Sequence, residues 1–168
     1  YAFQYAQKHG RKRVSIIHKA NIMKLTDGLF MRTAKAVAAE YPDIECDTYI
    51  VDAACMHMVI RPERYDVLLT GNMYGDILSA LAAGMVGGVA QPGIAIGDEA
   101  VIFESLQHRD SPEDSGPLAL LNPAYHMLVH LGEKEAADRL WDALEGACAD
   151  GDLADTKAIF SKLSARLQ

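Results

Sequence analysis

The sequence predicts an α/β fold in which helices cover both faces of a layered sheet. Strand and helix patterns alternate three times within the first ninety of its 168 residues, and such alternation is typical of a sheet with helices packed against it. The third expected strand, residues 65–71, is dense in aliphatic side chains, as in strands that are covered on both faces. Half of all residues are hydrophobic and 23% are charged, which is the composition of a folded globular domain.

Each expected element follows from the spacing of apolar residues and from the residues that stop it. The chain opens with residues that match the later turns of an amphipathic helix, and Thr26 or Asp27 caps the next helix, which Pro42 stops. Pro123 is placed at the first turn of a later helix, where proline is tolerated. The expected strands are residues 14–17, 47–51, 65–71 and 99–105, and the expected helices are residues 1–6, 26–41, 52–60, 73–86, 123–144 with a break at Gly132, and 156–168.

The charge pattern and the cysteines restrict the classes of partner. The formal net charge is −7, with acids and bases interspersed and no block of like charges, so the sequence predicts neither a nucleic-acid partner nor a membrane partner. Three widely spaced cysteines without a CxxC pair fit a reducing compartment, and we expect a cytoplasmic protein, or a mitochondrial matrix protein in a eukaryote. The first residue is not methionine, so we expect a piece of a longer chain.

Polar residues follow the ends of all three expected strands. They are the segment His18-Lys19-Ala20-Asn21, then Asp52, then Asn72 with Asp76 one turn further on. Ligands of open α/β sheets bind at the carboxyl ends of the strands, where loops and helix starts leave hydrogen-bond donors unpaired. Taken singly, each residue also has a plainer reading, because an aspartate at a helix start is usually a cap or dipole partner and a lysine is usually a solvated charge.

Three segments carry a resemblance to a known family. The stretches "HKANIMKLTDGLF", "VDAACMHMV" and "YDVLLTGNMYGDILS" resemble, in order and separation, signature segments of the β-decarboxylating dehydrogenases, the isocitrate, isopropylmalate and homoisocitrate dehydrogenases. The first is most similar to the NAD-dependent isocitrate members. The resemblance covers only the later half of a family chain. It implies an isopropylmalate-dehydrogenase-like fold in which residues 1–64 belong to the dimerisation part or small domain and residues 65–168 to the large domain.

The resemblance also assigns roles to four residues. Family members oxidise a 2-hydroxy acid with NAD or NADP, and the resulting β-keto acid loses carbon dioxide while magnesium or manganese holds the enolate. By resemblance, Lys19 relays the hydroxyl proton across a dimer interface, and Asn21 contacts the substrate or the nicotinamide. Asp52 corresponds to a metal carboxylate lent to the neighbouring subunit, and Asp76 to the first metal carboxylate of the subunit's own pair. Hard divalent cations prefer such oxygen ligands.

One departure from the family pattern concerns the metal. The family reads G-D-x-x-S-D, with two aspartates four residues apart, so that both side chains lie on the same helix face. In this chain Ala80 occupies the second position and leaves Asp76 without its helical partner. We therefore expect weak binding of magnesium or manganese.

A second departure concerns the cofactor. His108 and Asn122 match a histidine and an asparagine that contact the adenosine of NAD or NADP in the family. The segment between them is two residues longer than the family pattern, and Glu113 and Asp114 add negative charge, which is unfavourable beside a pyrophosphate. The sequence therefore predicts a weakened or lost cofactor site.

Two functions remain open from the sequence. The chain is either part of a metal-dependent dehydrogenase that acts on a small 2-hydroxy acid such as isocitrate, or a non-catalytic regulatory or structural subunit with degraded metal and cofactor sites. In either case we expect a homodimer or a heteromer with a family homologue. The expected helices at residues 26–41 and 52–60 are the candidates for one intersubunit layer, as in the family.

Overall fold

The chain divides into two compact units, residues 1–86 and 87–168. The computed structural model describes residues 1–86, 92–105, 118–149 and 156–167. Residue 65, where the sequence predicts the change from the dimerisation part to the large domain, lies within the first unit, and the strand that follows it pairs with the strand at residues 13–18. The assignment of these two parts stays a prediction.

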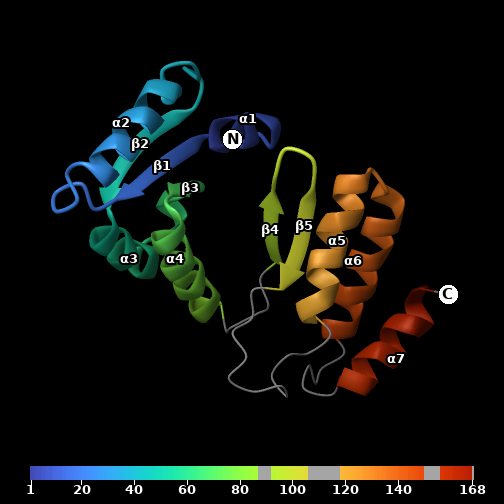
Figure 1. The fold of residues 1–168 in the computed structure, drawn as a ribbon. Helices are drawn as coiled ribbons and strands as arrows, with labels where there is room; N and C mark the ends of the chain where they lie inside the picture. The colour runs from blue at the N-terminus through green and yellow to red at the C-terminus, as the bar shows by residue number, and fades with distance from the viewer. Residues whose placement is uncertain (87–91, 106–117, 150–155, 168) are drawn as a thin grey trace. The chain divides into compact units, whose positions relative to one another are not determined.

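The first unit is a small parallel sheet with helices on both faces (Figure 1). Its three strands lie in the order β2-β1-β3, and both pairs are parallel. The elements in chain order are α1 (Ala2–Lys8), β1 (Arg13–His18), α2 (Thr26–Ala38), β2 (Glu45–Ile50), α3 (Val51–Ile60), the 3-10 turn η1 (Pro62–Arg64), β3 (Val67–Thr70) and α4 (Asn72–Met85). The predicted α/β class with helices on both sheet faces is confirmed.

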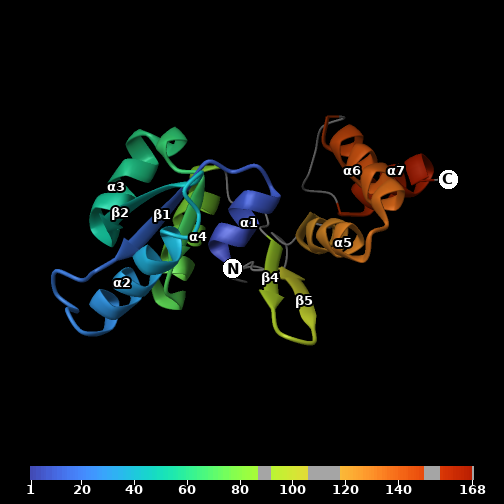
Figure 2. The same ribbon diagram turned by 90° about the horizontal axis from the view of Figure 1, so that it is seen from above.

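Alternation along β1 explains why both faces are covered. Val14 packs with Phe3 and Ala6 of α1 and with Ile44, whereas Ile17 points to the other face. There Ile17 joins a cluster with Ala54 and Met58 of α3 and Leu78 of α4. A second view shows helices on both sides of β1 (Figure 2).

Leu78 is the main contribution of α4 to this second cluster. It is 2% exposed, so Leu78→Ala is expected to lower the free energy of unfolding by about 2–5 kcal/mol, through lost burial and the cavity left behind. Urea unfolding followed by circular dichroism measures the change. Leu29→Ala is the matched control, since Leu29 lies on α2 and is 60% exposed; an equal loss in both variants would contradict this packing.

The second unit combines an antiparallel hairpin with helices. Strands β4 (Pro92–Ile96) and β5 (Val101–Ser105) pair with each other, and α5 (Leu118–Leu131), α6 (Lys134–Ala149) and α7 (Thr156–Leu167) follow. Leu140, Ala143 and Leu144 of α6 pack with Leu163 of α7, and side chains of α5 surround them. Gly132 has a φ of +83° in the link between α5 and α6, which suits glycine. The helix break predicted at this residue is confirmed.

The start of α5 differs from the expectation. The helix was expected to begin at Pro123, but it begins five residues earlier, so this proline lies inside it. Leu121, which precedes the proline, packs against the cluster of α6 and α7. This apolar contact extends the helix backwards and outweighs the missing N–H group of proline.

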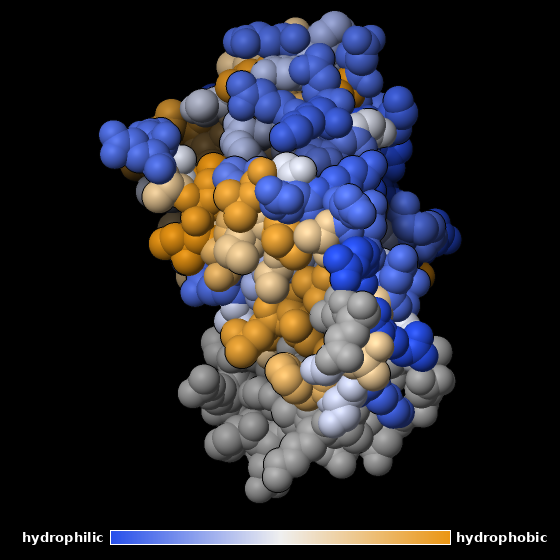
Figure 3. Space-filling model, turned by 90° about the vertical axis from the view of Figure 1, so that its right-hand side faces the viewer, coloured by the Kyte–Doolittle hydropathy of each residue, from blue (hydrophilic) through white to orange (hydrophobic). Residues whose placement is uncertain are grey.

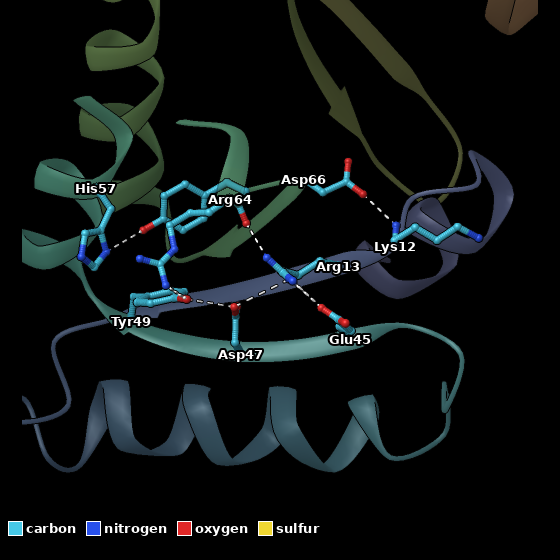
Figure 4. Close-up of polar contacts among 9 residues, drawn as sticks. Lys12, Arg13, Glu45, Asp47, Tyr49, His57, Arg64 and Asp66 are labelled. Carbon is cyan, nitrogen blue, oxygen red and sulfur yellow. Dashed lines mark hydrogen bonds and ion pairs between the residues drawn. The ribbon is translucent and has the colours of Figure 1, made fainter. Parts of the chain in front are cut away.

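A polar network joins the amino-terminal parts of β1 and β2 (Figure 4). The guanidinium of Arg13 donates to Glu45 through Nε at 2.8 Å and through a second nitrogen at 2.5 Å, and its Nη1 donates to the carbonyl of Arg64 at 2.8 Å. The hydroxyl of Tyr49 donates to Asp47 at 3.0 Å. Because these groups mostly satisfy one another, we interpret the network as support for the sheet.

Asp66 holds the beginning of β1 from the segment that leads into β3. Its Oδ2 accepts a hydrogen bond from the backbone N–H of Lys12 at 2.7 Å (Figure 4), and this bond is the main cause of its lowered pKa. A lowered pKa in the folded state stabilises the fold above the unfolded value of about 3.9, and this contribution is lost as the pH falls below it.

Stability should therefore respond differently to acid when Asp66 cannot titrate. Between pH 6 and pH 3 the unmodified chain is expected to lose more unfolding free energy than Asp66→Asn, because asparagine removes the proton uptake. Urea titrations at the two pH values measure the difference. Equal losses in both proteins would contradict the role of this carboxylate.

None of the described helices is long and apolar enough to cross a lipid bilayer. The space-filling view shows a patch of hydrophobic residues beside a hydrophilic region (Figure 3). In the second unit the exposed large apolar side chains include Leu120, Leu131 and Phe160.

Candidate functional site

The parallel register brings the three polar segments to one edge of the sheet. His18 of β1 pairs with Ile50 of β2, and Ile17 pairs with Thr70 of β3. The strands therefore end side by side, and the residues that follow them, including Lys19 and Asp52, begin at the same edge. Because β1 lies between β2 and β3 and pairs in parallel with both, the segments that follow these strands become neighbours although they are far apart in the sequence.

Lys19 and Asp52 form an ion pair at this edge. The Lys19 Nζ atom donates to Oδ1 of Asp52 at 2.9 Å. This hydrogen bond is the main cause of the lowered pKa of Asp52, and the first backbone N–H groups of α3 lower it further. The side chain of Lys19 is 27% exposed and that of Asp52 is 68% exposed, so the carboxylate faces outwards and is accessible to another molecule.

The backbone of Lys19 is held by the loop that leads into α2. Its N–H donates to Oδ2 of Asp27 at 2.7 Å, and its carbonyl accepts from the N–H groups of Ile22 at 3.0 Å and Met23 at 2.8 Å. The expectation that Thr26 or Asp27 caps α2 was wrong, because the helix follows Leu25 without a side-chain cap. The carboxylate of Asp27 binds the amide of Lys19 instead.

His18 is the buried residue that immediately precedes the pair. Burial lowers its pKa, which favours the neutral imidazole at neutral pH. Its Nδ1 accepts a hydrogen bond from the N–H of Ala20 at 3.1 Å. The neutral ring thus supports the turn and brings no positive charge beside Lys19.

Asp76 lies in the second turn of α4 and makes different contacts. The amide of Asn72 donates to its Oδ2 at 3.4 Å, and the hydroxyl of Ser79 donates to its backbone carbonyl at 3.1 Å. Within the described residues, no hydrogen bond or ion pair connects Asp76 with Lys19 or Asp52. The structure therefore brings Lys19 and Asp52 together and places Asp76 at the same edge on another element.

Within the described ranges, the oxygen and nitrogen donors of this chain do not by themselves fit a divalent metal. Among the described residues, no group of three or more His, Cys, Asp or Glu side chains could hold an ion. Ala80, one turn after Asp76, is exposed and offers no oxygen. A metal centre of the family type would require carboxylates beyond those that the described part of the chain gathers.

The other predicted site residues lie elsewhere in the chain. Asn21 is exposed in the loop after Lys19. Asn122 is half-buried within α5. His108, with Glu113 and Asp114, lies outside the described residues, so the proposed adenosine contacts remain predictions.

Sequence reasoning missed two residues of this edge. Asp27 was considered only as a cap, and Tyr74 was not considered at all, although its hydroxyl donates to the sulfur of Met23 at 3.6 Å. No local pattern reveals either contact, because each joins a helix to a loop that folds back against it. The only available signal was an acid eight residues after Lys19.

Comparison with known proteins decides the family. The family model described as isocitrate/isopropylmalate dehydrogenase matches residues 1–164. The chain belongs to the isocitrate/isopropylmalate dehydrogenase family. The resemblance inferred from the sequence is confirmed, and the family's members are NAD-dependent and metal-dependent dehydrogenases.

Relatives within the isocitrate/isopropylmalate dehydrogenase family carry different names. The chloroplastic 3-isopropylmalate dehydrogenase of Solanum tuberosum is 43% identical over 157 residues, which are 90% of this chain and 44% of the relative. A mitochondrial regulatory subunit of NAD isocitrate dehydrogenase from Dictyostelium discoideum is 42% identical over 162 residues, 91% of this chain and 44% of the relative. A mitochondrial catalytic subunit of NAD isocitrate dehydrogenase from Arabidopsis thaliana is 43% identical over 157 residues, 90% of this chain and 42% of the relative.

A solved structure of the family has the same fold. The crystal structure of isocitrate dehydrogenase from Methylococcus capsulatus superposes with a TM-score of 0.91 at 43% identity, covering 99% of this chain and 54% of that one. The chain spans less than half the length of the curated relatives described above. Catalytic and regulatory subunits match it about equally well, so identity to relatives does not assign its role.

Proposed function

We propose that this chain acts in an oligomeric, NAD(P)-dependent decarboxylating dehydrogenase of a 2-hydroxy acid such as isocitrate. Its contribution is to supply Lys19 and Asp52 to a site completed by a neighbouring subunit. The observation that carries this proposal is the Lys19–Asp52 ion pair of 2.9 Å, with an outward-facing carboxylate. The pair exists within the chain, while, among the described residues, the carboxylates of a complete metal site do not gather there.

The chemistry of the pair suits this role. An ammonium group can donate its proton to a substrate oxygen, and the neutral amine that remains can take a proton back, provided that the nitrogen is held at a defined position. Asp52 holds Lys19 in this chain and remains exposed, so its second oxygen can bind a cation supplied with the neighbouring site. Asn21 would contact the substrate or nicotinamide from the same loop.

A second candidate is a regulatory or structural subunit without any catalytic contribution. Ala80 at the position of the family's second aspartate favours it, and some relatives are named regulatory subunits. The two candidates differ in one respect. A lending subunit needs Lys19 and Asp52 for the turnover of its neighbour, whereas a purely structural subunit does not.

A mixed enzyme separates these candidates. In the isocitrate dehydrogenase of Methylococcus capsulatus, the segment aligned with residues 1–164 is replaced by this chain to give a chimera. The chimera is co-expressed with the same enzyme carrying methionine at the lysine aligned with Lys19. Isocitrate-dependent reduction of NAD⁺ or NADP⁺ in the purified mixed dimer, above that of either homodimer, supports lending. A mixed dimer as inactive as its parents would refute it.

The surface of α3 and α4 is the proposed interface with the neighbouring subunit. The helices expected to form one intersubunit layer, α2 and α3, lie on opposite faces of the sheet. Ala38 of α2 contacts the cluster around Val14, and Ala54 of α3 belongs to the cluster around Ile17. The neighbour of α3 is α4. Their exposed apolar side chains, which favour an interface, are Met56, Val59, Ile60, Met73, Ile77 and Met85.

Sedimentation of the chain tests this interface. We expect a dimer at micromolar concentration, and Val59→Glu is expected to weaken it at least tenfold by placing a charge in the apolar contact. Leu29→Glu on α2 is the control, since Leu29 is 60% exposed and Val59 is 59% exposed. A monomeric unmodified chain, or equal weakening by both variants, would contradict the assignment.

A further inference from the structure

The position of the Lys19 ammonium depends on how its backbone is fixed. Lys19 directly follows β1, so its amide lies beyond the last strand residue. A long lysine side chain reaches a defined point only when its own backbone is fixed, because its four rotatable bonds otherwise sample many positions. The group that fixes the Lys19 amide therefore bears on the ion pair with Asp52.

Asp27 is the side chain that binds this amide. Its Oδ2 accepts the Lys19 N–H at 2.7 Å across eight residues of sequence. The carbonyl of Lys19 is occupied by the N–H groups of Ile22 and Met23. Both backbone polar groups of Lys19 thus have partners, and only the partner of the N–H is a side chain that a substitution can remove.

Asp27 is itself held in place from several sides. It lies in the first turn of α2, where a carboxylate is stabilised by the helix dipole. The hydroxyl of Thr26 donates to its Oδ1 at 3.4 Å. Its carboxylate also contributes to the raised pKa of Tyr74, after burial as the main cause, so the first turn of α4 approaches it as well. A carboxylate held in this way can fix the position of the loop that begins at Lys19.

We infer that Asp27 is a positioning residue, which holds the Lys19 backbone so that the ammonium group reaches Asp52. This inference rests on the proposed function of the pair, since positioning matters only if the pair acts in a reaction. Asp27 need not touch the substrate. Its effect depends on the hydrogen bond to the Lys19 N–H and on the Lys19 side chain, which reaches Asp52.

The fold offers a matched control for the test. Asp66 makes the same kind of bond at the other end of β1, where its Oδ2 accepts the N–H of Lys12 at 2.7 Å. Removing either carboxylate deletes a 2.7 Å hydrogen bond to a backbone N–H. Each removal also deletes one longer side-chain contact, from Thr26 to Asp27 at 3.4 Å or from Arg11 to Asp66 at 3.2 Å. Only Asp27 is bound to the residue whose ammonium contacts Asp52.

The experiment measures the order of lysine side chains by NMR relaxation in the 168-residue chain, with ¹³C-labelled lysine and no substrate or metal. In the unmodified chain we expect the ε-methylene of Lys19 to be more ordered than that of the exposed Lys24. Asp27→Ala is expected to lower the Lys19 order parameter to the level of Lys24. Asp27→Asn, which keeps an acceptor oxygen, is expected to retain most of the order, and Asp66→Ala is expected to leave Lys19 unchanged.

The outcomes separate positioning from a general loss of stability. Lys19 that stays ordered in Asp27→Ala, or becomes equally disordered in Asp66→Ala, would overturn the inference. If Asp27→Ala does not fold, Asp27→Ser replaces it, because serine is tolerated at helix starts but is too short to reach the amide, and the same loss of order is expected. Since the measurement requires no turnover, its failure is distinct from a failure of the mixed enzyme.

Discussion

Replacing Lys19 with methionine in the mixed enzyme is expected to lower its turnover by about 10²–10⁴-fold, the usual contribution of a general acid or base. In the mixed dimer, Lys19 of the chimera is the lysine that serves the site of the neighbouring subunit. That subunit itself carries methionine at the aligned position. Methionine keeps the unbranched shape but cannot carry a proton. Initial rates of NAD⁺ or NADP⁺ reduction with isocitrate at saturating Mn²⁺ measure the loss.

Two variants control this result. Lys24→Met removes an exposed lysine from the same loop and is expected to leave turnover within about twofold. Asp52→Asn keeps the shape of the partner of Lys19 but removes its charge. It is expected to lower turnover and to weaken the binding of Mn²⁺, so that more Mn²⁺ is needed for half-maximal turnover. If Lys19→Met turned over as fast as Lys24→Met, the chain would have a structural role only.

Ala80→Asp is expected to tighten the binding of Mg²⁺ or Mn²⁺ at least about tenfold. Residues four apart on a helix have Cβ atoms about 5–6 Å from each other, so the new carboxylate would lie beside Asp76, one turn away. Two adjacent carboxylates supply the charge and oxygen atoms that a hard cation prefers. For the unmodified chain, calorimetry is expected to show no binding below millimolar concentration.

A second aspartate elsewhere on α4 tests whether proximity is required. Gly84→Asp adds the same charge to the same helix at an exposed position. It is eight residues from Asp76, which corresponds to about 12 Å along the axis, and is too distant to share an ion. Equal tightening by both variants would indicate a general charge effect, and submillimolar binding by the unmodified chain would refute the weakened site.

Local patterns in the sequence were sufficient for most elements and for the common edge of the sheet. Parallel strands that each end in polar residues, such as Lys19 and Asn72, predict a shared edge because their carboxyl ends coincide. The partner of Asp27 could not be predicted in this way. An aspartate at a helix start is expected on local grounds to act as a cap. Only the folded loop shows that the carboxylate of Asp27 accepts the N–H of Lys19 instead.

Two other differences have the same origin in tertiary packing. Pro123 was expected to start a helix on local grounds, but the contact of Leu121 with α6 and α7 draws the helix start back to Leu118. The helices α2 and α3 were expected in one layer, and alternation along β1 places them on opposite faces. Spacing along a chain reveals that a helix has an apolar side, but the partner of that side depends on the whole sheet.

The bond between Lys19 and Asp52 has a consequence for assembly. A bare ammonium ion entering a contact between subunits must shed its hydration shell, which is costly in free energy. In the separate chain Lys19 is already paired with Asp52, so much of its desolvation free energy is spent before the subunits associate. Association by this surface is therefore expected to vary little with ionic strength, in contrast to a contact between unpaired opposite charges.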